Sequence, residues 1–174
     1  MTGAIFFDRD NTLVKDNGYT WKISDFAFLL DSAEALAFLN SFKIPVFIVT
    51  NQSGIARGYF DEADLLKYNQ HLTKQVALRG GNIWDIAYCP HHPDYPEKAK
   101  TTKCNCRKPL PGMLKMISYK WQIDLNKSIM IGDKETDIQA GKAAGCLESF
   151  LIEGTESREK LCKLIISKYF IEKT

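Results

Sequence analysis

The stretch AIFFDRDNT, residues 4–12, passes directly from an apolar, aromatic run into charged and polar residues. Short runs that stop at polar, turn-rich segments are typical of buried parallel strands. Residues 4–8 therefore predict a strand, and Asp8 marks its carboxyl end. Because open α/β sheets bind their ligands at the carboxyl ends of the strands, this stretch also predicts where a site would lie.

Four more runs of this kind predict strands at residues 45–50, 83–89, 128–133 and 148–154. Segments with helical periodicity lie between and after them, at residues 32–42, 61–80, 111–122, 135–145 and 156–170. Strands that alternate with helices predict an α/β fold, with a Rossmann-like parallel sheet flanked by helices on both faces. At 174 residues, the chain has the size of one domain.

The composition is that of a protein with an ordinary hydrophobic core: 45% of the residues are hydrophobic, and 23 basic residues nearly balance 21 acidic ones. No run of like charge resembles a nucleic-acid-binding arm, and no apolar run approaches the roughly 18 residues of a membrane span. The first ten residues lack the order of a signal peptide, so we expect a cytoplasmic protein. In a reducing compartment, five cysteines indicate metal ligation, with Cys146 and Cys162 as ordinary buried thiols.

Acidic and hydroxyl side chains recur at the carboxyl ends of three predicted strands. Asp8 and Asp10 follow the first strand, Thr50 ends another, and Asp133 and Asp137 follow a third. Carboxylate oxygens with room for water suit Mg²⁺, which accepts one or two carboxylates together with a substrate phosphate. Two acids after a single strand are commonly a solvated loop, but three segments that converge on one crevice favour a site for Mg²⁺ and an anion.

The motifs CPHHP and CNCRKP concentrate three cysteines and two histidines in a loop at about residues 89–109. Two short ligand pairs on tight turns can present four nitrogen and sulfur donors to a tetrahedral Zn²⁺. The candidate ligands are Cys89, His91 or His92, Cys104 and Cys106. Four protein ligands leave no open position, so the predicted zinc is structural and holds the loop in shape. Free cysteines in a surface loop are the alternative.

Arg107 and Lys108 directly follow the last of these cysteines, so the zinc would determine where both cations point. Lys108 can act as a point charge on a phosphoryl group, and Arg107 can bind a second anionic group through two parallel hydrogen bonds. The loop would therefore contribute to the same crevice as the acids.

In order, DRDNT at residues 8–12, Thr50, Lys108 and Asp133 resemble the motifs of the haloacid dehalogenase superfamily of phosphatases. Four ordered motifs at predicted strand ends are far more specific than any one of them. The resemblance covers most of the chain. It implies a Mg²⁺-dependent phosphoric monoester hydrolase, a single domain at residues 1–174 without a large cap domain, and His91 as the nitrogen ligand of zinc.

By this resemblance, Asp8 is the nucleophile that forms an aspartyl-phosphate, and Asp10 acts first as acid and then as base. The carboxylates of Asp8 and Asp133 and the backbone carbonyl of Asp10 would hold Mg²⁺. Asp137 is either a partner of the metal site or an acid in the first turn of a helix. The implied catalytic set is Asp8, Asp10, Thr50, Arg107 and Lys108. The residues implied to bind substrate are Asp16, Asn17, Gly18, Tyr19, Asn51, Gln52, Ser53 and Lys134.

Within the superfamily, the motifs DNGYT, TNQSGIARG, CPHHP and CNCRKPLPGM resemble the group of D,D-heptose 1,7-bisphosphate phosphatases and histidinol phosphatases. The twelve residues between His91 and Cys104 favour the heptose branch, which implies a phosphorylated sugar as substrate and a role in making lipopolysaccharide core precursors. Asn11 stands where this group has glycine. Because Asn tolerates unusual backbone dihedrals, we expect a tuned site and not an inactive one.

Other functions stay open from the sequence. Histidinol phosphate or another small phosphomonoester could be the substrate, and a phosphotransferase could use the same aspartyl-phosphate. A zinc-stabilised module that binds nucleic acid is a different class of protein, against which the balanced charge weighs. The anomer, α or β, of a heptose bisphosphate is not indicated. An open site without a large cap is compatible with a monomer, which we expect.

Overall fold

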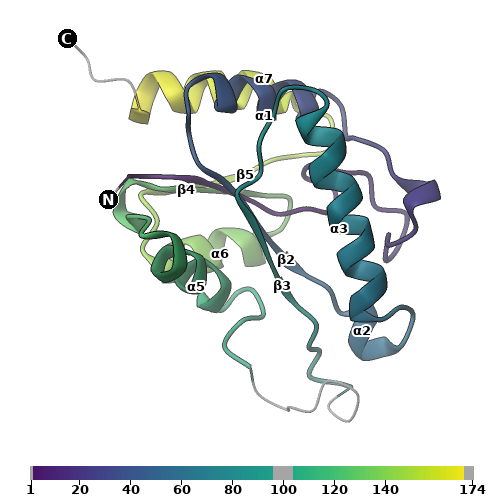
Figure 1. Ribbon diagram of the computed structural model, residues 1–174. Coiled ribbons are helices and arrows are strands. Elements are labelled where there is room, and N and C mark those ends of the chain that lie inside the picture. Colours follow the sequence, from purple (N-terminus) through teal and green to yellow (C-terminus); the bar gives the residue numbers. More distant parts are fainter. Residues whose placement is uncertain (1, 96–103, 171–174) are drawn as a thin grey trace.

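The computed structural model describes residues 2–95 and 104–170 (Figure 1). Five strands form one sheet in the order β3-β2-β1-β4-β5, and every neighbouring pair is parallel. The strands are β1 (Ile5–Phe7), β2 (Val46–Asn51), β3 (Asp85–Cys89), β4 (Ile129–Gly132) and β5 (Glu148–Leu151). The prediction of a five-stranded parallel sheet flanked by helices is confirmed.

The helices follow the predicted alternation with strands. They are α1 (Ser32–Ser41), α2 (Gly54–Arg57), α3 (Glu62–Ala77), α5 (Gly112–Trp121), α6 (Glu135–Ala144) and α7 (Arg158–Ile165). Asp61 and Asp64 form a capping box at the start of α3, where each side chain accepts a backbone N–H of the other residue. Gly145 ends α6 in the left-handed conformation, with φ of 90°.

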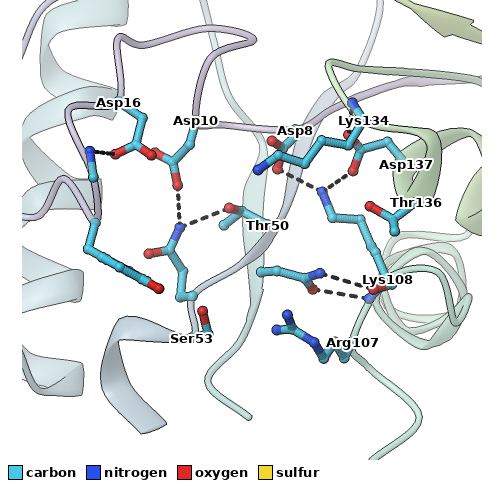
Figure 2. A pocket seen from close by; sticks show the side chains of 14 residues that line it. Asp8, Asp10, Asp16, Thr50, Ser53, Arg107, Lys108, Lys134, Thr136 and Asp137 are labelled. Carbon is cyan, nitrogen blue, oxygen red and sulfur yellow. Dashed lines mark hydrogen bonds and ion pairs between the residues drawn. The ribbon is translucent and has the colours of Figure 1, made fainter. Parts of the chain in front are cut away.

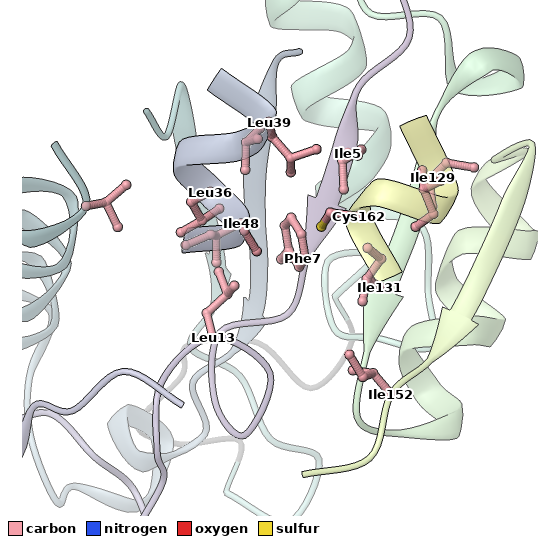
Figure 3. Packing of buried hydrophobic residues seen from close by; sticks show 14 of the residues in the cluster. Ile5, Phe7, Leu13, Leu36, Leu39, Ile48, Ile129, Ile131, Ile152 and Cys162 are labelled. Carbon is pink, nitrogen blue, oxygen red and sulfur yellow. The ribbon is translucent and has the colours of Figure 1, made fainter. Parts of the chain in front are cut away.

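Alternate residues of β1 face opposite sides of the sheet, and each side has its own buried core. Ile5 and Phe7 pack with residues of α1 and α7, among them Leu36 and Cys162 (Figure 3). Phe6 belongs to the second core, which includes residues of α5 and α6. Figure 1 shows α1 and α7 on one face of the sheet and α5 and α6 on the other.

The sheet reverses its winding at β1, and this positions the site. From β1 the chain continues to β2 and β3 on one side, whereas β4 and β5 lie on the other. Asp8 follows β1, Thr50 lies in β2, and Asp133 follows β4 directly. These side chains therefore lie at the carboxyl edge of three adjacent strands, where doubly wound sheets form a crevice.

The structure differs from the predicted elements in some places. The short helix α2 was not predicted, because its four residues contain no helical repeat of apolar positions. Residues 83 and 84 precede β3, and β5 lies at the sheet edge with Glu148 and Leu151 exposed. The last predicted helix ends as a π-helix at Ile166–Phe170. The middle of the predicted zinc loop, residues 96–103, lies outside the described residues.

None of the helices within residues 2–95 and 104–170 combines the length and apolar character needed to cross a bilayer.

Candidate active site

A cavity of about 410 Å³ opens at the carboxyl edge of the sheet (Figure 2). Its walls come from the segments after β1 and β2, from the end of the 104–109 segment and from the start of α6. The lining residues are Asp8, Asp10, Asp16, Gly18, Tyr19, Thr50, Asn51, Gln52, Ser53, Arg107, Lys108, Lys134, Thr136 and Asp137. The structure thus brings together residues that lie as far as 129 positions apart, from Asp8 to Asp137.

The buried ammonium group of Lys108 lies between two carboxylates (Figure 2). Its Nζ lies 2.7 Å from Asp8 Oδ1 and 2.6 Å from Asp137 Oδ1, and it also donates to the carbonyl of Val49 at 2.7 Å. Burial by itself would lower the pKa of Lys108, but the two carboxylates outweigh it and raise the pKa. Lys108 therefore stays charged and holds Asp8 in a fixed position.

Asp10 is fixed by Arg9, a residue to which the sequence assigned no role. The completely buried Arg9 guanidinium donates to both carboxylate oxygens of Asp10, at 2.9 and 3.0 Å. The amide of Gln52 donates to Asp10 Oδ2 at 2.7 Å and to Thr50 Oγ1 at 2.9 Å. Burial raises the pKa of Asp10 although Arg9 opposes the shift. A carboxyl group with a raised pKa and a fixed orientation suits general acid catalysis.

Arg9 is itself held by groups outside the cavity. Nη1 donates to Asn69 Oδ1 in α3, Nη2 donates to the carbonyl of Thr20, and the guanidinium lies over the Tyr68 ring at 4.7 Å. A charged side chain with so many fixed partners cannot easily change rotamer. The orientation of Asp10 therefore depends on α3, which contributes no residue to the cavity.

Three carboxylates could hold a metal ion next to Asp8. Oxygens of Asp8, Asp133 and Asp137 lie within 4.8 Å of one another. The buried Asp133 Oδ1 has no hydrogen-bond partner among the described residues. Burial, followed by the charge of Asp8, raises the pKa of Asp133 to about 6. An unpaired buried carboxylate oxygen beside a surplus of negative charge fits a hard divalent cation such as Mg²⁺.

Asp137 is an acid in the first turn of a helix and also lies beside the candidate metal ligands. It lies in the first turn of α6, and its Oδ2 accepts the backbone N–H of Lys134 at 3.0 Å. Its other oxygen forms the ion pair with Lys108. Asp137 thus connects a helix N-terminus to the buried lysine beside Asp8.

The four candidate zinc ligands form a second cluster. Ligand atoms of Cys89, His91, Cys104 and Cys106 all lie within 4.8 Å of one another. Cys89 Sγ lies 3.5 Å from His91 Nδ1, 3.7 Å from Cys104 Sγ and 3.2 Å from Cys106 Sγ. A tetrahedron with zinc–sulfur bonds of about 2.3 Å has edges of about 3.8 Å, so this donor set fits Zn²⁺.

His92 points away from that cluster. Its Nε2 lies 3.2 Å from Arg57 Nη2, and the Arg57 guanidinium also donates to Tyr95 Oη at 2.9 Å. The same guanidinium lies 5.8 Å from the ring of Tyr19, which lines the cavity. Arg57, to which the sequence motifs assigned no role, therefore connects the segment before residue 96 to the rim of the cavity.

The segments that carry the candidate zinc ligands, at residues 89–92 and 104–106, are joined to the cavity through backbone contacts. Arg107 Nη1 donates to the carbonyl of His91 at 3.0 Å. The side-chain amide of Asn51 pairs with Lys108 in both directions, accepting from its N–H at 3.0 Å and donating to its carbonyl at 3.1 Å. Asn51 lines the cavity, but its polar atoms are engaged by the protein and act as a clamp on Lys108.

The remaining predicted substrate residues divide into two groups. Asn17 is not among the residues that line the cavity. The residues of the other group line it: Asp16, Gly18, Tyr19, Gln52, Ser53, Arg107 and Lys134. Asp16 Oδ1 accepts the backbone N–H groups of Gly18 and Thr20 and the Thr20 hydroxyl, which closes the turn. Thr136 also lines the cavity and was not predicted. Its position one residue before Asp137 was the signal that could have identified it.

Known proteins match the chain in sequence and in fold. A family model described as HAD-hydrolase-like matches residues 105–171. A D-glycero-beta-D-manno-heptose-1,7-bisphosphate 7-phosphatase from Photorhabdus laumondii is 45% identical over 141 residues, which cover 81% of this chain and 75% of that protein. A D-glycero-alpha-D-manno-heptose-1,7-bisphosphate 7-phosphatase from the same organism is 39% identical over 150 residues and covers 85% and 81%.

A solved structure agrees with these relatives. The crystal structure of D,D-heptose 1,7-bisphosphate phosphatase from B. bronchiseptica, complexed with magnesium and phosphate, has a TM-score of 0.83 and 31% identity. The match covers 96% of this chain and 99% of that one. Motifs, fold and relatives lead to one conclusion: the chain belongs to the haloacid dehalogenase-like phosphatases, in the family of the heptose-1,7-bisphosphate 7-phosphatases.

Proposed function

We propose that the protein is a Mg²⁺-dependent phosphatase that removes the 7-phosphate of D-glycero-D-manno-heptose 1,7-bisphosphate through an aspartyl-phosphate intermediate. The observation that carries this proposal is the arrangement around Asp8. Its carboxylate lies at the floor of a polar cavity, is oriented by a charged lysine, and neighbours a second acid that is held by Arg9 and Gln52. Nucleophile and acid are thereby separated into two fixed groups.

In the first step, a carboxylate oxygen of Asp8 attacks phosphorus in line with the leaving sugar oxygen. The phosphorus–oxygen bond to the sugar breaks, and Asp10 gives its proton to that oxygen. In the second step Asp10, now ionised, takes a proton from the water that attacks the aspartyl-phosphate. Inorganic phosphate leaves and Asp8 is restored, so Asp10 serves as acid and then as base.

The carboxylates of Asp8 and Asp133, with the backbone carbonyl of Asp10, are the groups that we propose to hold Mg²⁺. When bound, Mg²⁺ would neutralise charge on the transferring phosphoryl group and help to orient it. The unpaired Asp133 Oδ1 supports this assignment.

Cationic and hydroxyl groups around the cavity would bind the phosphate oxygens. Lys108 and Thr50 are the proposed ligands of the transferring phosphoryl group, and both are nearly inaccessible to solvent. Arg107 and Lys134 also line the cavity and would bind the rest of the anionic substrate. The polar turn at residues 16–19 would bind sugar hydroxyls, for which carboxylate and backbone groups are suitable partners.

Zinc at the Cys89, His91, Cys104 and Cys106 cluster would be structural in this proposal. It would fix the segment that ends in Arg107 and Lys108, because those residues directly follow Cys106. In the same proposal the protein is a cytoplasmic monomer that supplies heptose precursors of the lipopolysaccharide core. The names of the relatives support the sugar substrate.

The test is phosphate release in the presence of Mg²⁺ from the α and β anomers of the heptose bisphosphate, from histidinol phosphate and from para-nitrophenyl phosphate. We expect the heptose bisphosphates to exceed the other substrates by at least a hundredfold in kcat/KM. Equal or better turnover of histidinol phosphate would contradict the substrate assignment. Relatives named for each anomer match this chain, so the ratio between the anomers is itself a result of the experiment.

A further inference from the structure

The side chain of Arg158, the first residue of α7, is completely buried beside the loop that follows Asp8. Nε donates to the carbonyl of Thr12 at 2.9 Å, and Nη2 donates to the carbonyl of Asn11 at 3.2 Å. Nη1 donates to the carbonyls of Gly154 and Glu156. A buried guanidinium thus ties the segment before α7 to the turn that follows Asp10.

Two general preferences are violated at this position. A buried cation normally has a carboxylate partner, but the described acceptors of the Arg158 side chain are all backbone carbonyls. A cation in the first turn of a helix also faces the positive end of the helix dipole, which is unfavourable. Local rules of this kind are most often broken at functional sites, where another requirement outweighs them.

The turn that Arg158 contacts has an unusual backbone. Asn11 has φ of 57°, in the left-handed region, and the N–H groups of Leu13 and Val14 both donate to the carbonyl of Arg9. This tight turn leaves the carbonyls of Asn11 and Thr12 to be satisfied from outside. The planar guanidinium, with donors in a rigid fork, can satisfy both at once.

We propose that Arg158 is a positioning residue for the reaction: by holding the carbonyls of Asn11 and Thr12, it keeps Asp10 in place for both proton transfers. This inference rests on the proposed function of Asp8 and Asp10. Thr50 and Lys108, the proposed phosphate ligands, come from other segments and form no hydrogen bond with Arg158. Loss of Arg158 should therefore slow turnover and leave phosphate binding unchanged.

The experiment compares Arg158→Met, Arg158→Lys and Asp31→Ala in the full-length protein. Asp31 is the matched control, because it accepts the backbone N–H of Arg158 at 2.8 Å and the hydroxyl of Ser157. Asp31→Ala removes this support from the start of α7 without removing the guanidinium. The Tm of each protein is measured first. The kcat and KM for para-nitrophenyl phosphate and the inhibition constant of inorganic phosphate are then measured at a temperature well below the lowest Tm.

We expect Arg158→Met to lower kcat at least tenfold, since small displacements of a catalytic group cost that much or more. KM and the phosphate inhibition constant should stay within twofold of the wild type. Arg158→Lys, which keeps the charge and some donors, should recover part of kcat. Asp31→Ala should lower the Tm and keep kcat within twofold.

Three results would overturn the inference. The first is an unchanged kcat in Arg158→Met. If Arg158→Met does not fold, an unchanged kcat in Arg158→Lys takes its place. The second is an equal loss of kcat in Asp31→Ala, which would make the effect one of general stability. The third is a loss of phosphate binding parallel to kcat. A wild-type protein that releases no phosphate would instead remove the proposed function itself, and the positioning role with it.

Discussion

Lys108 decides the electrostatics of the site at the scale of single residues. One buried cation faces Asp8 and Asp137 directly, and Asp133 lies within reach of both carboxylates. Lys108, with Lys134 acting on Asp133 from the start of α6, leaves three acids with a surplus of negative charge, which a bound divalent cation would offset. Burial, followed by the charge of Asp8, raises the pKa of Asp133 to about 6, so the surplus of negative charge adds to the effect of burial.

This surplus predicts how the stability of the metal-free protein changes with pH. The pKa of Asp133 is about 6 in the folded protein and 3.8 ordinarily, so the folded state binds this proton more tightly than the unfolded state does. Protonated Asp133 therefore adds to the free energy of unfolding below pH 4, and this contribution is lost as the pH rises to about 6.

Denaturant titration at pH 4.5 and 6.5 in the presence of a chelator should show this loss in the wild type. Asp133→Asn should reduce the loss by about 1 to 2 kcal/mol, allowing for the partial exposure of the group. Saturating Mg²⁺ should restore the stability of the wild type at pH 6.5 and have little effect on the variant. A pH dependence that is the same in both proteins would contradict the interpretation.

Arg9 predicts a second residue-level effect. Arg9→Lys keeps a positive charge but cannot donate two parallel hydrogen bonds to Asp10. We expect kcat to fall about 10- to 100-fold and the free energy of unfolding to fall by about 2 to 3 kcal/mol. The measurements are steady-state kinetics and denaturant titration. As a control, Lys67→Arg alters an exposed lysine of α3 and should leave both quantities unchanged.

The sequence predicted the acids and cations of the site because strand ends and motif order determine where they lie. It could not predict Arg9, whose partners Thr20 and Asn69 come from distant segments. Nor could it predict that the amide of Asn51 is engaged by Lys108. Which atoms of a cavity residue remain free for a substrate is a property of tertiary contacts, and no residue pattern carries it.

At the scale of elements, β2 and the segments with the candidate zinc ligands, at residues 89–92 and 104–106, act as one support for Lys108. Asn51, at the end of β2, holds the Lys108 backbone, and Arg107 holds the carbonyl of His91. The backbone N–H of Gly112, at the start of α5, donates to the carbonyl of Asn105 at 2.9 Å. The position of Lys108 therefore depends on a segment with few apolar residues, which a structural metal would stabilise.

Removal of the metal should consequently affect both stability and turnover. We expect Cys106→Ser to lower the Tm by about 10 °C and kcat at least tenfold, and to abolish the zinc that elemental analysis would find in the wild type. Cys146→Ser changes a partly buried thiol outside the cluster and should retain the zinc and the activity. A zinc-free Cys106→Ser variant with normal Tm and turnover would contradict the structural role.

Element types were predictable where the periodicity was strong, as in β1, β2, α3 and α5. The sequence did not predict α2, because a single helical turn has no repeat to detect. It also treated residues 156–170 as one helix, whereas the last turn is a π-helix. Apolar spacing hardly distinguishes these two forms over five residues, so hydrogen-bond pattern decides between them.

At the scale of the whole molecule, two cores on opposite faces of one sheet hold three strand ends in a fixed relation. The reversal of winding at β1 places Asp8 between Thr50 and Asp133. The 104–109 segment brings Lys108 into the cavity, and the buried Arg9 holds Asp10 from behind the cavity lining. In the proposed function, substrate preference is decided at the turn that contributes Asp16, Gly18 and Tyr19 to the cavity lining. Chemistry and specificity would then lie on different parts of the molecule.

The central claim is that Asp8 is the nucleophile of a Mg²⁺-dependent phosphatase. The most direct test compares phosphate release from D-glycero-D-manno-heptose 1,7-bisphosphate by the wild type and by Asp8→Asn, with and without Mg²⁺, after circular dichroism has shown that both proteins are folded. We predict Mg²⁺-dependent release by the wild type and a loss of at least a thousandfold in the variant. Release by Asp8→Asn at near the wild-type rate would contradict the account.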